Sequence, residues 1–141
     1  MAGTTKLSLE QVMQIAEFRS RLRAFLRDNE QGARRFGLTP QRYELLLAIK
    51  GAPSGAERLS FTELAQRIHR SRNSVTELCA RAEDAGLVAR TPSQIDQRVV
   101  YLHLTPEGER LLIGALKENE RFRQELMCAF EYLRESFSEP F

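Results

Sequence analysis

Two short helical patterns separated by a tight break lie in the middle of this sequence, and they constrain its fold more than any other feature. The first covers residues 60–68 and opens with a capping box formed by Ser60 and Glu63. The second covers residues 71–85, and Gly86 follows it at the position where a helix often ends in a left-handed residue. Two short helices joined in this way predict a helix-turn-helix unit.

A two-stranded hairpin is predicted directly after this unit. Residues 87–90 form a short apolar strand, and residues 99–104 place apolar side chains at every second position. The polar loop of residues 91–97 joins the two strands and contains Pro92 and Asp96. A hairpin with a long tip in this position is a wing, so the pattern predicts a winged helix-turn-helix.

Two further helices are predicted before this region. The first begins after Ser8 and extends to about Asn29, and a basic linker between Gly32 and Gly37 follows it. Because its apolar residues cover more than one stripe, we expect it to pack on its own domain and on a second subunit. The next helix begins at Thr39-Pro40. Its predicted buried side consists of Tyr43, Leu46, Leu47 and Ile49.

The last helix is predicted to begin at Thr105-Pro106 and to continue without a breaker to near Pro140. Its apolar positions recur about every 3.5 residues, which is the period of a helix that packs along another helix. This seam consists of Leu112, Leu116, Asn119, Phe122, Leu126, Phe130 and Leu133. Asn119 within the seam either fixes the register of a helix pair or faces solvent.

Together these elements predict a single domain of residues 1–141, of mainly α (α+β) class. The winged helix-turn-helix with its two-stranded wing is expected in residues 38–104. Flanking dimerisation helices are expected in residues 8–30 and 105–137.

The second helix of the helix-turn-helix has a buried side and a polar side. A step of about 100° per residue places Leu78, Cys79 and Ala82 beside Val75 on the buried side. The opposite side is small or polar, which lets a helix approach the major groove of DNA closely. An ordinary solvated helix face has a similar composition and is the alternative. The residues expected to contact DNA are Arg72, Asn73, Ser74, Thr76, Glu77 and Arg81.

Positive charge gathers around the same unit, although the net charge of the chain is only +2. Residues 64–76 hold three arginines and no acid, as suits a surface that meets phosphates. A general preference for arginine as the surface cation explains the same basicity. The residues expected to contact phosphate are Thr62, Arg70 and Ser71.

The predicted wing carries Asp96-Gln97-Arg98 at its tip. An arginine there is placed to enter the minor groove, where the negative potential of DNA is strongest. Asp96 is placed to orient the Arg98 guanidinium by a charge-assisted hydrogen bond. The three residues of the tip are therefore expected to contact DNA.

Composition excludes several classes of protein. No stretch reaches the ~20 apolar residues of a membrane-spanning helix, and the N-terminus lacks the pattern of a secretion signal, so we expect a cytoplasmic protein without membrane contact. Two cysteines and two histidines lack metal-ligand spacing, so no metal or cofactor is expected. Without a phosphate loop or a nucleophile elbow, no catalytic residues are expected either.

Five blocks of the sequence resemble the MarR family of bacterial transcriptional regulators in their order and spacing. The blocks are LAQRI (64–68), SVTEL (74–78), EDAGLVAR (83–90), DQR (96–98) and LTPEG (104–108), within a resemblance that covers roughly residues 38–116. The resemblance implies a homodimeric repressor that binds double-stranded DNA at a pseudo-palindromic operator. It makes the helix from Arg72 to Ala85 the recognition helix and Arg98 the wing arginine. It also implies release of DNA by a small aromatic ligand or by thiol oxidation.

The sequence departs from the family in two ways. Family members have a break and a further helix after the long one, and this chain stops too early for both at full length. We therefore expect dimerisation to depend on the first helix and the seam. The redox branch of the family has its cysteine near the first two helices, where this chain has none. Oxidation of the inward-facing Cys79 is the remaining route to a thiol-based regulator.

An effector pocket is expected from the resemblance, between the dimerisation helices and the DNA-binding lobe. The aromatic residues expected near it are Phe18, Phe25, Phe36 and Tyr43, for which a plain core position is the simpler interpretation. A winged helix that binds protein instead of DNA is the alternative function. That alternative requires an apolar surface on the recognition helix, and the sequence places none there.

Overall fold

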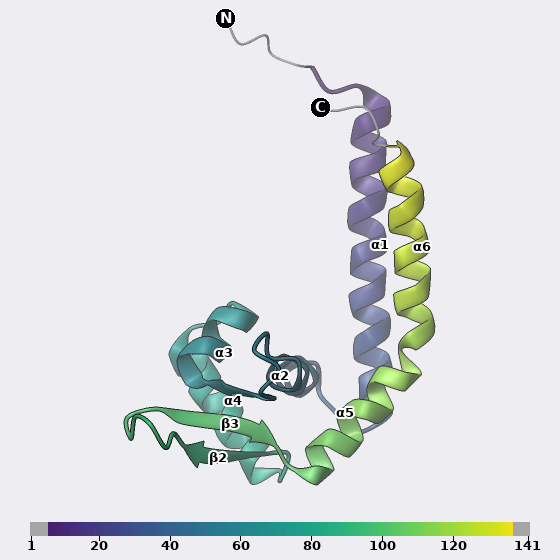
Figure 1. The fold of residues 1–141 in the computed structure, drawn as a ribbon. Coiled ribbons are helices and arrows are strands. Elements are labelled where there is room, and N and C mark those ends of the chain that lie inside the picture. Colours follow the sequence, from purple (N-terminus) through teal and green to yellow (C-terminus); the bar gives the residue numbers. More distant parts are fainter. Residues whose placement is uncertain (1–5, 137–141) are drawn as a thin grey trace, which may run out of the picture.

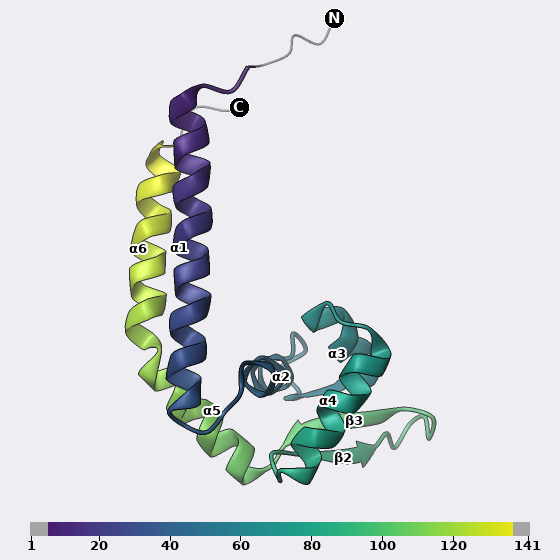
Figure 2. The same cartoon turned by 180° about the vertical axis from the view of Figure 1, so that it is seen from behind.

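The computed structural model describes residues 6–136, which form a long two-helix stalk joined to a winged-helix lobe (Figure 1). The stalk consists of α1 (Leu9–Arg34) and α6 (Glu120–Ser136), which lie side by side in both views (Figures 1 and 2). Helix α5 (Pro106–Glu118) leads from the lobe back to the stalk. The expected domain ends at residues 1 and 141 lie outside the described residues.

The lobe confirms the predicted winged helix-turn-helix. Its elements are α2 (Pro40–Lys50), β1 (Arg58–Ser60), α3 (Phe61–Ile68), α4 (Arg72–Asp84), β2 (Val88–Pro92) and β3 (Val100–Leu104). The strands form an antiparallel sheet in the order β1-β3-β2, in which Leu102 lies opposite both Leu59 and Arg90. The strand β1 was not predicted, because three residues are too few to show an alternation.

The local signals that predict the helix-turn-helix are present as hydrogen bonds. Ser60 Oγ accepts from the Glu63 N–H at 3.2 Å, and Glu63 Oε1 accepts from the Ser60 N–H at 3.2 Å. His69 ends α3 in the left-handed conformation, with φ 56°, which reverses the chain within a short turn. Ser71 then caps α4 by accepting from the Ser74 N–H at 3.2 Å.

The end of α4 is fixed by Gly86, which has φ 74°. The Gly86 N–H donates to the Glu83 carbonyl at 2.9 Å, and the Leu87 N–H donates to the Ala82 carbonyl at 3.0 Å. This pair of bonds is the Schellman motif, and it turns the chain directly into the wing. The predicted C-cap is therefore confirmed.

The core of the lobe surrounds α2, and one side chain there differs from the prediction. Tyr43, Leu46 and Ile49 are buried as expected, but Leu45 is buried in place of Leu47, which is 40% exposed. Because α2 is apolar on nearly every side, spacing alone does not show which leucine faces outward.

The first helix is longer than predicted. It extends past Asn29 to Arg34, so Gly32 lies inside the helix and the expected linker begins only at Arg35. Glycine is unfavourable within a helix, but here it allows a close contact with Asn119.

The predicted single last helix is wrong, because the chain breaks at Asn119 between α5 and α6. The Asn119 side chain is fully buried, and its Nδ2 donates to the Asn29 carbonyl at 3.0 Å. It therefore neither faces solvent nor lies in a continuous seam. The break and further helix of the MarR pattern are both present, contrary to our expectation from the chain length. The predicted helix end near Pro140 lies outside the described residues.

After the break, the predicted seam packs on the chain's own first helix. Phe130 of α6 stacks on Phe18 of α1 with ring centroids 4.9 Å apart and planes 17° from parallel. Leu133, one turn further along α6, is buried. The stalk is thus an intrachain helix pair.

Candidate nucleic-acid interface

Helix α4 has one buried and one exposed face, as the sequence predicts. Val75, Cys79 and Ala82 are fully buried in the lobe, and Leu78 is half-buried. The opposite face bears only polar side chains around the half-buried Ala80. Its exposed residues are Arg72, Asn73, Ser74, Thr76, Glu77 and Arg81. The structure therefore brings all six predicted recognition residues to one helix surface.

Several of these side chains are held by local contacts. Arg72 Nη1 donates to Thr62 Oγ1 at 3.2 Å, which links the start of α4 to α3. Thr76 Oγ1 donates to the Arg72 carbonyl at 2.9 Å. Arg81 and Glu77 form an exposed ion pair at 2.6 Å. Asn73 makes no side-chain hydrogen bond to any described residue, so its carboxamide is available to a base edge.

The three predicted phosphate contacts are exposed and also stabilise the fold. Arg70 and Ser71 lie in the turn between α3 and α4, and Thr62 lies in the first turn of α3. Ser71 Oγ donates to Ser74 Oγ at 3.0 Å. Arg70 Nη2 lies 3.4 Å from Glu44 Oε2, and Thr62 accepts from Arg72. These are weak, exposed interactions that a phosphate can replace.

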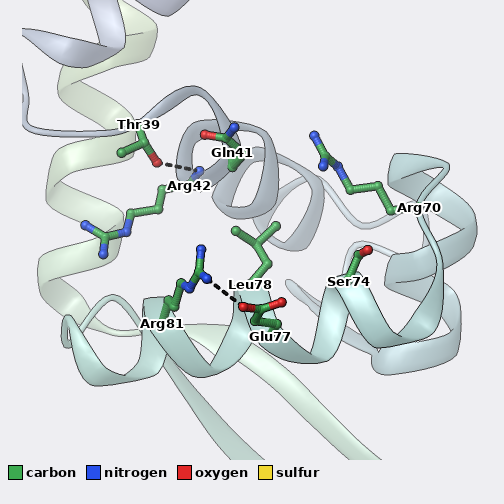
Figure 3. Close-up of a pocket in the computed structure, with 8 residues that line it drawn as sticks. All are labelled: Thr39, Gln41, Arg42, Arg70, Ser74, Glu77, Leu78 and Arg81. Atoms are coloured by element: carbon green, nitrogen blue, oxygen red, sulfur yellow. Dashed lines mark hydrogen bonds and ion pairs between the residues drawn. The ribbon is translucent and has the colours of Figure 1, made fainter.

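A groove of about 430 Å³ runs between α4 and the N-terminus of α2, and the sequence did not reveal it (Figure 3). Arginines from three elements line it: one from α2, one from the turn before α4 and one from α4 itself (Figure 3). Its lining residues are Thr39, Gln41, Arg42, Arg70, Ser74, Glu77, Leu78 and Arg81. Residues 39–42 are far from the recognition helix in sequence and lie beside it only in the folded chain.

At the wing tip, Asp96 holds Arg98 in the manner predicted. Asp96 Oδ1 accepts from the Arg98 N–H at 3.1 Å and from Nε at 3.4 Å. The Arg98 side chain is 91% exposed, and Gln97 is exposed beside it. Ile95, which the sequence analysis did not single out, is 99% exposed at the same tip.

The four aromatic residues expected near an effector pocket lie in different parts of the chain. Phe18 stacks on Phe130 in the stalk, and Tyr43 is buried with its hydroxyl 3.5 Å from Asn119 Nδ2. Phe25 and Phe36 line two separate hollows. Effector binding therefore stays a prediction, and in a single chain these residues do not surround a common cavity.

The two thiols differ in their surroundings. Cys79 is fully buried, and burial raises the pKa of its thiol from 9.0 to about 11. Because the thiolate is the reactive form, this burial argues against Cys79 as a redox sensor. Cys128 on α6 is exposed.

Neither metal ligation nor membrane insertion is indicated within residues 6–136. No group of three or more metal-ligating side chains occurs in this part of the chain. None of its helices combines the length and the apolar character needed to cross a bilayer.

The fold matches solved structures of one family. AbsC, a MarR family transcriptional regulator from Streptomyces coelicolor, superposes with a TM-score of 0.73 at 22% identity, covering 94% of this chain and 90% of AbsC. Sco3205 from the same organism, a MarR family regulator solved in complex with DNA, gives a TM-score of 0.69 at 22% identity, covering 89% and 78%. Residues 36–99 match the sequence model of the MarR family. The matched segment, residues 36–99, belongs to the MarR family.

Two characterised relatives are similar over part of their length. The transcriptional regulator FarR of Neisseria gonorrhoeae is 40% identical over 74 residues, which are 52% of this chain and 48% of FarR. The homoprotocatechuate degradative operon repressor of Escherichia coli is 32% identical over 97 residues, 69% of this chain and 63% of the repressor. Both relatives are named as regulators and not as enzymes, in agreement with the expectation that this chain is not an enzyme.

Proposed function

We propose that this MarR family protein is a sequence-specific DNA-binding transcriptional regulator that acts as a homodimeric repressor. The observation that carries the proposal is the exposed polar face of α4, which is supported from beneath by Val75 and Cys79. A helix of this kind fits the major groove, while Arg98 on the wing reaches the neighbouring minor groove. DNA binding in turn places the protein in the cytoplasm.

The relatives support the same function. The structure of Sco3205 contains DNA, and the homoprotocatechuate protein is named a repressor of its operon. The shared family and fold make DNA the partner that best explains the polar helix face. A protein-binding winged helix is less well supported, because the face carries no large apolar side chain.

A second copy of the chain explains the apolar surface of the stalk. Seven large apolar side chains of α1 are more than a third exposed: Leu9, Val12, Met13, Ile15, Phe18, Leu22 and Leu26. So many exposed apolar side chains on one helix are unusual on a monomer and typical of an interface. A two-fold dimer through the stalk presents two copies of α4 to a pseudo-palindromic operator.

Release by a small aromatic ligand is part of the proposal and depends on the family likeness alone. Calorimetry with a panel of aromatic acids tests it. A heat of binding that disappears with an excess of operator DNA supports this regulation. If no acid in the panel binds, the repressor has another signal.

The DNA-binding function is tested by selection of bound duplexes from a random library with the purified protein. We expect recovery of a pseudo-palindrome whose half-sites are about one helical turn apart, since each subunit contributes one recognition helix. Recovery of unrelated sequences would mean that the protein does not read bases through a symmetric pair of helices.

A further inference from the structure

We propose that the arginine-lined groove between α2 and α4 binds a phosphate of the DNA backbone, with Arg42 as its principal contact. This inference rests on the proposed function and adds a contact at the N-terminus of α2, outside the helix-turn-helix and the wing. It extends the DNA-binding surface from the recognition helix toward the stalk.

The position of the groove follows from the residues that form its floor. Ser74, Glu77 and Arg81 belong to the exposed face of α4 and also line the groove (Figure 3). A helix in the major groove has a sugar–phosphate strand on each side, because that groove is only about 12 Å wide. When α4 lies in the major groove, one DNA strand therefore lies beside these residues. Arg42 lines the other side of the same protein groove.

The charges of the groove favour an anion. Arg81 is paired with Glu77 at 2.6 Å, and Arg70 lies 3.4 Å from Glu44. The Arg42 guanidinium, in contrast, forms no ion pair or hydrogen bond with any described residue. One arginine of the three is thus uncompensated within the described chain, and the other two have exposed partners that a phosphate can displace.

The N-terminus of α2 adds to the positive electrostatic potential of the groove. Thr39 caps this helix by accepting from the Arg42 N–H at 3.2 Å, and Pro40 occupies its first turn. The positive end of the helix dipole therefore lies beside the Arg42 side chain. Among the described residues that line the groove, Leu78 alone is apolar, so a polar, charged occupant fits it better than an apolar one.

The test measures binding of the full chain to two fluorescent duplexes, the selected sequence and a shuffled version of it, over a range of salt concentrations. The variants are Arg42→Ala and Arg42→Lys. Arg134→Ala is the matched control, because Arg134 lies in the last turn of α6 and its loss changes the net charge equally. Size-exclusion chromatography confirms that each variant keeps the oligomeric state of the natural protein.

We expect Arg42→Ala to weaken binding to both duplexes by about tenfold and to lower the salt slope by about two for a dimer, since each lost phosphate contact removes about 0.9. Arg42→Lys keeps the charge and should keep most of the slope. Arg134→Ala should bind like the natural sequence.

Other outcomes are distinguishable. An Arg42→Ala protein with the natural salt slope overturns the phosphate contact and leaves the proposed function intact. A loss confined to the selected duplex shows that Arg42 reads bases, and this also overturns the inference. If the natural protein binds neither duplex, the proposed function itself fails.

Discussion

The Cα of Gly32 packs directly against the carboxamide oxygen of Asn119, and a Cβ at position 32 would overlap that oxygen. Asn119 Oδ1 is buried and has no hydrogen-bond donor among the described residues. On its other side, the Asn119 Nδ2 donates to Asn29 of α1 and approaches Tyr43 of α2. One side chain thus links stalk to lobe and fixes the angle between them.

Replacement of Gly32 by alanine is therefore expected to destabilise the protein. Alanine favours the helix by up to about 1 kcal/mol, but the added methyl displaces a buried carboxamide, and overpacking of this kind costs about 1–3 kcal/mol. We expect a net loss of about 1 kcal/mol or more in the free energy of unfolding, measured by urea denaturation. Gln31→Ala, at the exposed neighbouring position, is the control and should not lose stability. Equal stability of both variants would show that Asn119 moves aside without cost.

Asn73 and Arg98 are expected to contribute to DNA binding in different ways. The Asn73 carboxamide is exposed and unpaired within the described chain, so Asn73→Ala should broaden base preference with a small loss of non-specific affinity. Arg98 is proposed to meet the minor groove and the DNA backbone, so Arg98→Ala should weaken binding to all sequences alike. Repeating the library selection with each variant measures the difference. Identical base preferences in the Asn73→Ala and natural proteins would remove Asn73 from the reading surface.

Burial of Cys79 is expected to make stability depend on alkaline pH. Its folded-state pKa of about 11 lies above the ordinary 9.0, so the folded protein holds this proton more tightly than the unfolded chain. The resulting stabilisation is fully present below about pH 9 and is lost as the pH rises toward about 11. The free energy of unfolding of the natural protein should fall more steeply over this window than that of Cys79→Ala, which has the same lysines and tyrosines. Parallel curves would mean that the thiol ionises freely in the fold.

The apolar surface of α1 predicts a dimer in solution. Met13 is 63% exposed on the stalk, and a charge there is costly only if a second chain covers it. Sedimentation of the natural protein should give twice the chain mass of 16.2 kDa, and Met13→Glu should shift it toward the monomer. Gln31→Glu introduces the same charge at an exposed polar position and should remain dimeric. A monomeric natural protein at micromolar concentration would contradict the stalk interface.

Much of the lobe was predictable because its boundaries are set by local chemistry. The capping hydroxyls of Ser60 and Ser71, together with Gly86 at a left-handed position, fix α3 and α4 through contacts within a few residues in sequence. The exposed face of α4 follows from the helical repeat alone. The Asp96–Arg98 contact is equally local, since its partners are two positions apart in the sequence.

The features that escaped prediction depend on partners distant in sequence. No proline or glycine in the sequence marks the helix break at Asn119. The break instead accompanies a buried hydrogen bond from the Asn119 side chain to Asn29, 90 positions away. The strand β1 is defined by its pairing with β3. Leu47 is exposed because the neighbouring helices and the sheet cover the other faces of α2. The groove beside Arg42 arises in the same way, from the tertiary approach of α2 to α4.

The exposed face of α4 is the surface proposed to meet DNA, and a single negative charge at its centre is the sharpest test of that role. Thr76 is exposed there, and Thr76→Glu should leave the fold intact while repelling the duplex. In equilibrium titrations of the selected duplex, the natural protein and the control Gln124→Glu, on the exposed surface of α6, should bind in the range of roughly 10⁻⁸ to 10⁻¹¹ M. Thr76→Glu should bind at least about a hundredfold more weakly. Undiminished affinity in Thr76→Glu would show that this face does not meet DNA, and a natural protein that binds no duplex at low salt would not be a DNA-binding regulator.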